Sequence, residues 1–213
     1  YKACKKEGIK PIIGCEVYVA SRTRFDKEPQ DKKYYHLILL AKNNKGYQNL
    51  SKLVSLGFTE GYYYKPRIDL EILEKYHEGI ICLSGCLAGS VSQAILNGNI
   101  EEAENVAKWH KNVFGEDYYL EIQNNGVKDQ VMVNQKLIQI ARRLDIPIVA
   151  TNDAHYLKKA DAYNHEVLLC IQTGKRITDE DRMRFETDEL YVKSPEEMSE
   201  YFKNFPDAIE NTV

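Results

Sequence analysis

The stretch IPIVATNDAHY, residues 146–156, decides how this chain is organised, because an apolar run ends in two metal-competent side chains. The run has the β-branched character of a buried strand. Side chains at i and i+2 of extended backbone share a face, so Asp153 and His155 can converge on one ion if the strand continues through them. A carboxylate and an imidazole suit zinc, manganese or iron. The alternative is a polar turn in which Asp153 caps the next helix and His155 is merely exposed.

The composition is that of one soluble globular domain. The 213 residues are 43% hydrophobic, which is enough for one substantial core. A formal net charge of -3 argues against a general electrostatic grip on nucleic acid, although a local basic patch stays open. No run reaches the roughly 20 apolar residues of a membrane span, so we expect a cytoplasmic protein. The 5 scattered cysteines favour reduced thiols over a disulfide framework.

Apolar, β-branched runs alternate with amphipathic segments along the chain. Strands are expected over residues 9–20, 35–41, 79–84, 118–123 and 146–151. Helices are expected over residues 47–56, 69–76, 88–96, 100–114 and 129–144. The alternation predicts an α/β architecture of parallel βα units. Further along, helices are expected over residues 161–171, from 194 and from 206, with a short strand at 190–192.

The helix expected over residues 100–114 carries the clearest boundary signals. Asn99 is a cap, acidic residues fill the first turn, and Gly115 ends the helix. Its apolar residues recur at steps of three and four, and His110 belongs to that series. We therefore expect His110 at the edge of the core and not as a metal ligand.

Each expected strand also delivers a residue that can bind metal. In a closed parallel barrel the strand ends meet at one face, so residues distant in sequence can form one site. Glu16 lies among apolar residues, where an unpaired charge is costly, which favours a ligand. His36 can instead be a rim histidine bonded to backbone, and Cys86 a small buried thiol. Their company with Asp153 and His155 makes a shared metal site the hypothesis to test.

Three further residues are candidates outside that set. Glu121 can bind metal or pair with a base such as Arg142 or Arg143, but a role in orienting a ligand ranks first. The tract YYYKPR, residues 62–67, interleaves aromatics with Lys65 and Arg67, a pattern that can stack on bases and hold phosphates. It equally describes an ordinary amphipathic loop. The fork of donors on Arg67 suits two phosphate oxygens.

Several phrases of the sequence together resemble one family. They are GIKPIIGCE (residues 8–16), YKPRID (64–69), LSGCL (83–87), ATNDAHY (150–156) and LLCIQTGK (168–175). In this order they resemble the PHP domain of the bacterial DNA polymerase III alpha subunit, of the DnaE type. The resemblance runs through nearly the whole chain, so agreement by chance is implausible.

The resemblance implies a PHP-type distorted (β/α)7 TIM-like barrel whose strand ends hold a cluster of metal ions, commonly zinc and sometimes manganese or iron. Carried onto matching positions, the ligands here are Glu16, His36, Cys86, Asp153 and His155. Glu16, Asp153 and His155 would then act catalytically through the metal. The family's earlier ligands, among them a His-x-His pair, have no counterpart in this sequence. We therefore expect a fragment without the first strands, with an incomplete cluster and an open barrel.

The resemblance also implies a function and a division of the chain. Residues 1–213 would be a PHP domain fragment, with barrel elements in 1–157 and a C-terminal helical part in 158–213 leading toward the polymerase palm. The whole protein would be a DNA-directed DNA polymerase, a nucleotidyltransferase of bacterial DNA replication. The domain would act as a metal-dependent 3′-5′ proofreading exonuclease or as a scaffold, and the fragment alone is expected to be inactive. Implied partners are DNA, the rest of the polymerase chain, a proofreading exonuclease subunit and the sliding clamp.

Two alternatives stay open from the sequence. One is a free-standing PHP phosphoesterase that acts on a small ester such as histidinol phosphate, since barrel and ligands alone do not exclude it. The other is a non-catalytic scaffold domain. A scaffold is distinguished by low metal content and by stability that a chelator does not change, because a bound metal stabilises the folded state.

Overall fold

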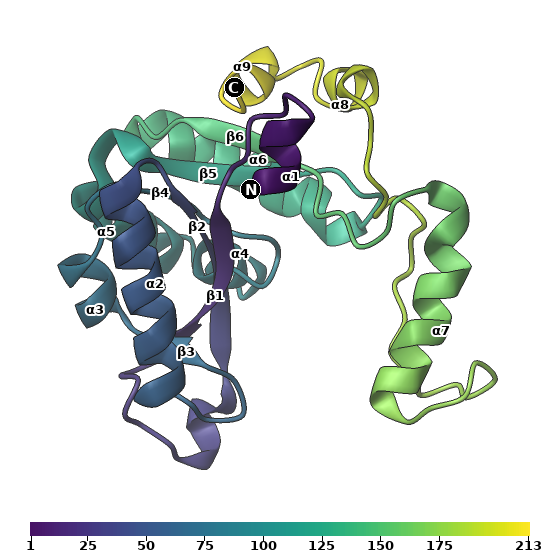
Figure 1. The fold of residues 1–213 in the computed structure, drawn as a ribbon, viewed down its shortest axis with the longest axis horizontal. Helices are drawn as coiled ribbons and strands as arrows, with labels where there is room; N and C mark the ends of the chain where they lie inside the picture. Colours follow the sequence, from purple (N-terminus) through teal and green to yellow (C-terminus); the bar gives the residue numbers. More distant parts are fainter.

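The centre of the structure is one mixed sheet of six strands, in the spatial order β3-β1-β2-β4-β5-β6 (Figure 1). A computed structural model describes the whole chain, residues 1–213. The strands are β1 (Gly14–Ala20), β2 (Tyr34–Ala41), β3 (Arg67–Ile68), β4 (Ile80–Leu83), β5 (Tyr118–Gln123) and β6 (Ile148–Thr151). β2 pairs antiparallel with β1 and β4, and the other neighbours pair in parallel. β2 therefore runs opposite to the remaining strands.

The mixed α/β class predicted from the sequence is confirmed, but the all-parallel arrangement is wrong at β2. The barrel is not confirmed, because the sheet is open, with β3 and β6 at its edges. The antiparallel pairing follows from the link between β1 and β2, residues 21–33, which contains only the short 3₁₀ turn η1 (Pro29–Lys32). Parallel neighbours need a crossover, usually a helix, whereas this link turns the chain straight back along β1.

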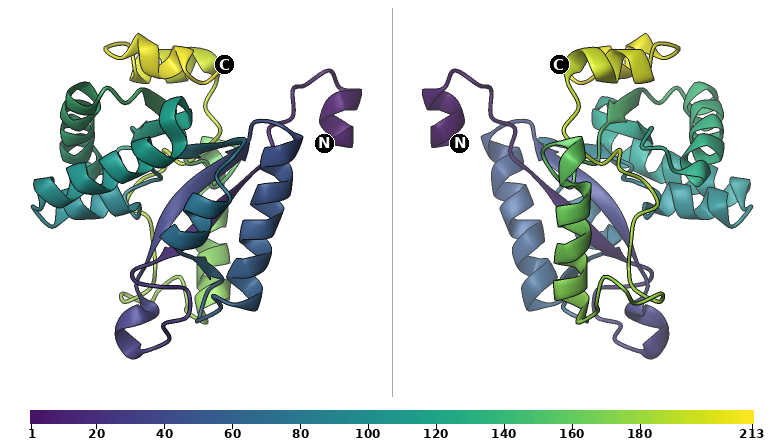
Figure 2. Two further views of the ribbon diagram at one scale, coloured as in Figure 1. Left: turned by 90° about the vertical axis from the view of Figure 1, so that its left-hand side faces the viewer. Right: turned by 90° about the vertical axis from the view of Figure 1, so that its right-hand side faces the viewer.

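The helices predicted from the sequence are present, with small shifts of their ends. They are α1 (Lys2–Lys6), α2 (Asn44–Thr59), α3 (Leu70–Lys75), α4 (Ser90–Leu96), α5 (Ile100–Phe114), α6 (Lys128–Leu144), α7 (Ala162–Thr173), α8 (Pro195–Tyr201) and α9 (Pro206–Glu210). Figure 2 shows α2 and α3 on one side of β1 and β2, and α7 on the other side. None of the helices combines the length and the apolar character that crossing a membrane requires.

Two strand predictions differ from the structure by more than two residues or in kind, and one strand, β3, was not predicted. β1 begins at Gly14 and not at residue 9, and the excluded segment contains Pro11, which lacks the N–H that a strand ladder uses. β3 has only two residues, too few to show a period in the sequence. The short strand expected at residues 190–192 is a single bridge between Tyr156 and Tyr191.

The two faces of β1 and β2 have different surroundings. Val17, Val19, Leu37 and Leu39 belong to the main hydrophobic core, which also contains side chains of α2. Side chains alternate along a strand, so the residues between them point to the opposite face. There the side chains are exposed or partly exposed, and Glu16 is among them. One face of these strands thus packs in the hydrophobic core, and the other face presents side chains that can bind a ligand.

The C-terminal part leaves the sheet and then returns to it. α7 stands apart from the sheet, whereas α8 and α9 lie above β6 (Figure 1). The Asn211 side chain donates a hydrogen bond of 2.8 Å to the carbonyl of Ile148 in β6. The helices expected within residues 158–213 are present. The division of the chain at residue 157 into a barrel part and a C-terminal helical part stays a prediction.

His110 lies in the core, as predicted. It is 3% exposed, and its Nδ1 lies 2.8 Å from the Val106 carbonyl, one turn earlier in α5. Its ring stacks on Tyr118 with ring centroids 5.1 Å apart. Burial lowers the pKa of His110 to about 4, so the imidazole stays neutral in the folded protein at neutral pH.

We predict that His110 contributes to acid destabilisation. Between pH 6.5 and about 4 the unfolded imidazole binds a proton that the folded one does not, so stability falls as pH falls through this range. Once the pH is below both pKa values, the lowered pKa of His110 has reduced the free energy of unfolding by about 3 kcal/mol. His110→Phe should flatten the pH dependence of thermal unfolding in this window. His77→Phe, at a partly exposed position, serves as the control, and equal slopes in wild type and His110→Phe would contradict the prediction.

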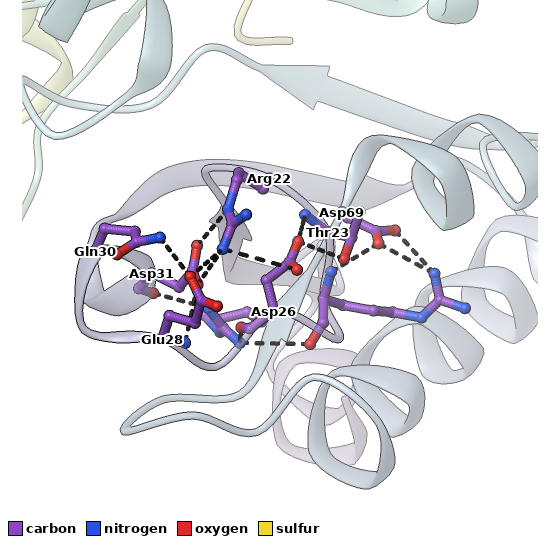
Figure 3. Close-up of polar contacts among 9 residues, drawn as sticks. Arg22, Thr23, Asp26, Glu28, Gln30, Asp31 and Asp69 are labelled. Carbon is purple, nitrogen blue, oxygen red and sulfur yellow. Dashed lines mark hydrogen bonds and ion pairs between the residues drawn. The ribbon is translucent and has the colours of Figure 1, made fainter.

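The loop between β1 and β2 is held by a dense polar network (Figure 3). Arg22 donates to both carboxylate oxygens of Asp31, at 2.8 and 2.7 Å, and pairs with Glu28 at 3.3 Å. Arg24 donates to Asp69 at 3.1 Å and to Glu60 at 2.7 Å. These contacts join the loop to itself, to the end of α2 and to the start of α3. The loop is consequently an ordered part of the fold although it has almost no regular secondary structure.

Arg67 is fully buried at the centre of this loop and does not have the exposure that phosphate binding requires. Its guanidinium donates to the carbonyls of Gly61, Asp31 and Asp26, at 3.1, 2.8 and 2.8 Å, and more weakly to that of Arg24. The predicted phosphate contact is therefore wrong for Arg67. Its planar fork of donors serves backbone carbonyls, because a loop without ladder hydrogen bonds needs other donors for them.

We predict that Arg67→Lys destabilises the protein by about 3 kcal/mol, because one ammonium cannot reach carbonyls on separate segments and some stay buried without a donor. Chemical denaturation followed by circular dichroism measures the change. Lys27→Ala, at an exposed position of the same loop, should shift stability by less than about 0.5 kcal/mol. Equal midpoints for Arg67→Lys and wild type would show that the carbonyls do not depend on the guanidinium.

Candidate metal centre

Three of the predicted ligands meet on the face of the sheet opposite α2 and α3. Nδ1 of His36 lies 3.3 Å from Oε1 of Glu16 and 3.7 Å from Sγ of Cys86. Glu16 and His36 come from the paired strands β1 and β2, where His36 is opposite Tyr18. The loop after β4 brings Cys86, and the amide of His36 ties that loop down by donating to the carbonyl of Ala88. Residues from three segments thus share one location.

The charge state of this trio is set by its contacts. Hydrogen bonding to Cys86 and to Glu16 raises the pKa of His36 to about 10, against the opposing effect of its partial burial. The imidazole therefore carries a proton in this arrangement at neutral pH. A metal ion bound by the ring nitrogen would replace that proton, so metal uptake here is coupled to proton release.

Glu16 is a member of the trio for a different reason from the one that the sequence suggested. Its neighbours along the chain are apolar, and burial of an unpaired charge was the expected cost. The side chain is 41% exposed, because it alternates with Val17 and points to the open face. The premise of burial is wrong, while the proximity to His36 makes a shared role with it feasible.

Asp153 and His155 form a second pair. Oδ1 of Asp153 lies 3.5 Å from Nε2 of His155. The backbone is not extended between them, as first expected, since β6 ends at Thr151 and Asp153 has a left-handed φ of 49°. A tight turn brings the two side chains together instead. Hydrogen bonding to Asp153 raises the pKa of His155.

The loop that carries this pair is held by the returning chain. His155 donates its backbone N–H to the carbonyl of Leu190 at 2.8 Å, and the Asn152 side chain donates to the carbonyl of Tyr191 at 2.7 Å. Lys193, a buried lysine, donates to the Asn152 side chain at 3.2 Å. Contacts distant in sequence therefore fix the backbone on both sides of Asp153.

The trio and the pair lie at the same end of the sheet but do not form one ligand shell. The negative charge of Glu16 contributes to the raised pKa of His155, so the two groups lie within electrostatic reach. No set of three or more His, Cys, Asp or Glu side chains has an arrangement that could hold a metal ion. Thiolate, imidazole and carboxylate are nevertheless the donors that zinc takes in proteins. The donor chemistry fits zinc, and the five-residue ligand set stays a prediction.

Glu121 connects the strand ends beneath these residues. It is buried, and its carboxylate accepts hydrogen bonds from the Gly85 N–H at 3.1 Å, from Gln123 at 2.9 Å and from the Thr151 hydroxyl. Burial raises the pKa of Glu121, and these hydrogen bonds oppose the rise. The alternative partnership with Arg142 or Arg143 is not seen among the ion pairs, and Arg143 pairs with Glu104 instead. Glu121 thus touches the neighbours of the candidate ligands, and its role in orienting them stays a prediction.

The polar partners of Glu121 were not predicted from the sequence. Gln123 follows Glu121 by two residues in an apolar strand, so both side chains point to the same face. This spacing is the feature of the sequence that could have predicted their contact. Lys193 had no local signal, because its partner Asn152 is far away in the sequence. Lys65 is exposed, with Nζ 5.8 Å from the centroid of the Tyr18 ring, and its contact with DNA stays a prediction.

The fold and this site define a mixed α/β domain with candidate metal ligands on the open face of its sheet. The sequence matches the PHP domain family over residues 1–125, and the chain belongs to that family. It is 51% identical over its full length to DNA polymerase III subunit alpha of Borreliella burgdorferi, and 47% identical to that of Treponema pallidum. Identity to the Thermus aquaticus subunit is 48% over 93% of the chain.

The chain spans only a part of these relatives. The matched region covers 19% of the Borreliella burgdorferi subunit, 18% of the Treponema pallidum subunit and 16% of the Thermus aquaticus subunit. The resemblance to the PHP domain of DNA polymerase III alpha subunits is thus confirmed. The activities of such whole proteins come to this chain only as proposals.

We predict that Glu121 holds the strand ends in register. Glu121→Ala leaves the buried Gly85 N–H without its acceptor, which should lower the free energy of unfolding by about 1–3 kcal/mol. Amide hydrogen exchange at Gly85 should become faster, and mass spectrometry of the peptide that contains it measures the rate. Glu101→Ala, at an exposed position of α5, is the matched control. If the exchange rate at Gly85 did not change in Glu121→Ala, Glu121 would have no role in positioning the loop that carries Cys86.

Proposed function

We propose that this chain works as the PHP domain of a replicative DNA polymerase III alpha subunit, where it holds a divalent metal centre. The observation that carries the proposal is 51% identity to such a subunit over the whole chain. The meeting of Glu16, His36 and Cys86 supports it, because their donor atoms are metal ligands in proteins. The comparisons give no support to a free-standing phosphoesterase.

The proposed ligands are Glu16, His36, Cys86, Asp153 and His155. Cysteine and histidine favour zinc over the harder ions, although manganese and iron also accept histidine and carboxylate. Glu16, Asp153 and His155 would act in catalysis through the metal. When bound, the metal would supply an activated water and stabilise phosphoryl charge. Glu121 would orient the loops that carry Cys86 and Asp153 through Gly85 and Thr151.

The reaction that suits this centre is removal of the 3′-terminal nucleotide of a DNA strand. Water adds to the phosphorus of the last phosphodiester, and the bond from phosphorus to the 3′ oxygen breaks. The 3′ oxygen takes a proton from the water, so the products are a nucleoside 5′-monophosphate and a strand with a new 3′-hydroxyl. The chain would in this way supply a 3′-5′ exonuclease to the polymerase.

The finer fold that we propose is the distorted (β/α)7 barrel of the family. The open edges at β3 and β6 support it, since an exposed edge strand presents unpaired backbone groups that another strand can satisfy. Nucleotide polymerisation would belong to other parts of such a protein. DNA, the rest of the polymerase chain, a proofreading exonuclease subunit and the sliding clamp are the partners proposed with it.

The test compares wild type and His155→Ala in the full-length protein. Metal content is measured by plasma mass spectrometry, and nuclease activity on a DNA strand labelled at its 5′ end. Loss of a ligand should lower metal affinity and the rate of 3′ cleavage by roughly ten- to a hundredfold. His77→Ala, outside the site, should change neither quantity. Unchanged metal content in His155→Ala would reject the ligand assignment, and bound metal without cleavage in wild type would reject the nuclease and leave a scaffold.

A further inference from the structure

Three aromatic rings form a continuous surface beside the candidate metal centre. Tyr18 and Tyr34 have ring centroids 4.7 Å apart, and Tyr18 lies 5.2 Å from the ring of His36. The Tyr34 and His36 rings are nearly parallel, at an interplanar angle of 3° and a centroid distance of 5.9 Å. The row leads from Tyr34, at the start of β2, to the residue that contacts Glu16 and Cys86.

The row is open to solvent because of the antiparallel register of β1 and β2. Tyr18 is directly opposite His36, and Tyr34 precedes His36 by two residues, so the three rings share one face. The helices α2 and α3 lie on the opposite side of these strands (Figure 2). All three side chains are partly exposed, whereas Val17, Val19 and Leu37 of the same strands are buried. The rings are thus a surface feature and not part of the core.

One unpaired lysine, Lys65, lies beside the aromatic row, and a second, Lys32, lies over the ring of Tyr64, the residue before Lys65. Nζ of Lys65 lies 5.8 Å from the centroid of Tyr18, and Nζ of Lys32 lies 4.8 Å from that of Tyr64. Neither lysine takes part in an ion pair, while the acidic residues Asp26, Glu28 and Asp31 of the neighbouring loop pair with Arg22. Lys65 therefore brings a positive charge without an ion-pair partner next to the partly exposed ring of Tyr18.

Arg67 links the two segments that carry these lysines. It donates to the carbonyls of Asp31 and Gly61, and so holds the loop that carries Lys32 against the turn that carries Lys65. The residue that the sequence suggested for phosphate contact thus positions two others that are free to make it. The backbone segments that carry the two lysines are thus held by buried hydrogen bonds.

We propose that Tyr18, Tyr34 and Lys65 form a binding subsite for the unpaired 3′ end of a single DNA strand, with His36 at its inner end. The inference rests on the proposed nuclease function and adds where the substrate binds. Exposed aromatic rings stack on bases, and lysines beside them hold the phosphates, which together are how proteins bind single strands. Paired bases inside a duplex do not present their faces, so a frayed or mismatched 3′ end is the ligand that fits.

The experiment uses the full-length protein and a strand with 5-iodouracil near its 3′ end and a phosphorothioate at the last linkage to resist cleavage. Ultraviolet crosslinking followed by peptide mass spectrometry should give a product in the β1–β2 hairpin, at Tyr18 or Tyr34. Tyr34→Ala should lower that yield roughly tenfold, and Tyr34→Phe, which keeps the ring, should restore it. Tyr47→Ala, an exposed tyrosine on α2, is the control and should leave the yield unchanged.

Several outcomes would overturn the proposal. They are crosslinks only outside the hairpin, an unchanged yield in Tyr34→Ala, and equal yields from a blunt duplex and a single strand. Cleavage kinetics add a second readout, in which Tyr34→Ala should raise KM roughly tenfold and leave kcat within about twofold. Metal content and cleavage separate this inference from the proposed function. Crosslinking in the hairpin without bound metal would refute the nuclease and keep the subsite. Bound metal and 3′ cleavage without hairpin crosslinks would keep the nuclease and refute the subsite.

Discussion

The antiparallel pairing of β1 with β2 is the constraint on which the site depends. It places His36 opposite Tyr18, so that the side chains of Glu16, Tyr18 and His36 share one face of the sheet. The same alternation sends Val17, Val19 and Leu37 into the core, where burial of their apolar surface stabilises the sheet. Because the side-chain period is two, a register shift of one residue would bury the charged face and expose the apolar one. Stability of the sheet and geometry of the site are therefore secured by one register.

Buried polar groups then fix the segments that the sheet does not pair. Arg67 satisfies carbonyls of the loop between β1 and β2, and Glu121 accepts hydrogen bonds from Gly85 and Thr151 at two further strand ends. Lys193 holds Asn152 beside Asp153. Each of these groups would be costly to bury without partners, so each needs the surrounding backbone to stay in place. Irregular loops are ordered here because their polar groups have specific buried partners.

The raised pKa of His36 connects this architecture to metal chemistry. Glu16 and Cys86 both lie against Nδ1 of the ring, and together they stabilise its protonated form. The same acceptors are metal donors once the proton leaves. The aromatic row of Tyr18 and Tyr34 lies directly beside this group, and it is there that we propose the DNA strand binds.

The sequence by itself determined the mixed α/β class, nearly all the helices, the core position of His110 and the family, because these depend on local periodicity, caps and short motifs. Only the tertiary structure decided that β2 runs antiparallel, that Arg67 is buried, and that Asp153 and His155 meet through a turn. Those features depend on partners distant in the sequence, such as Asp31 for Arg67, and no local pattern encodes the partner. The residue types of the candidate site could therefore be predicted from the sequence, whereas the contacts between these residues could not.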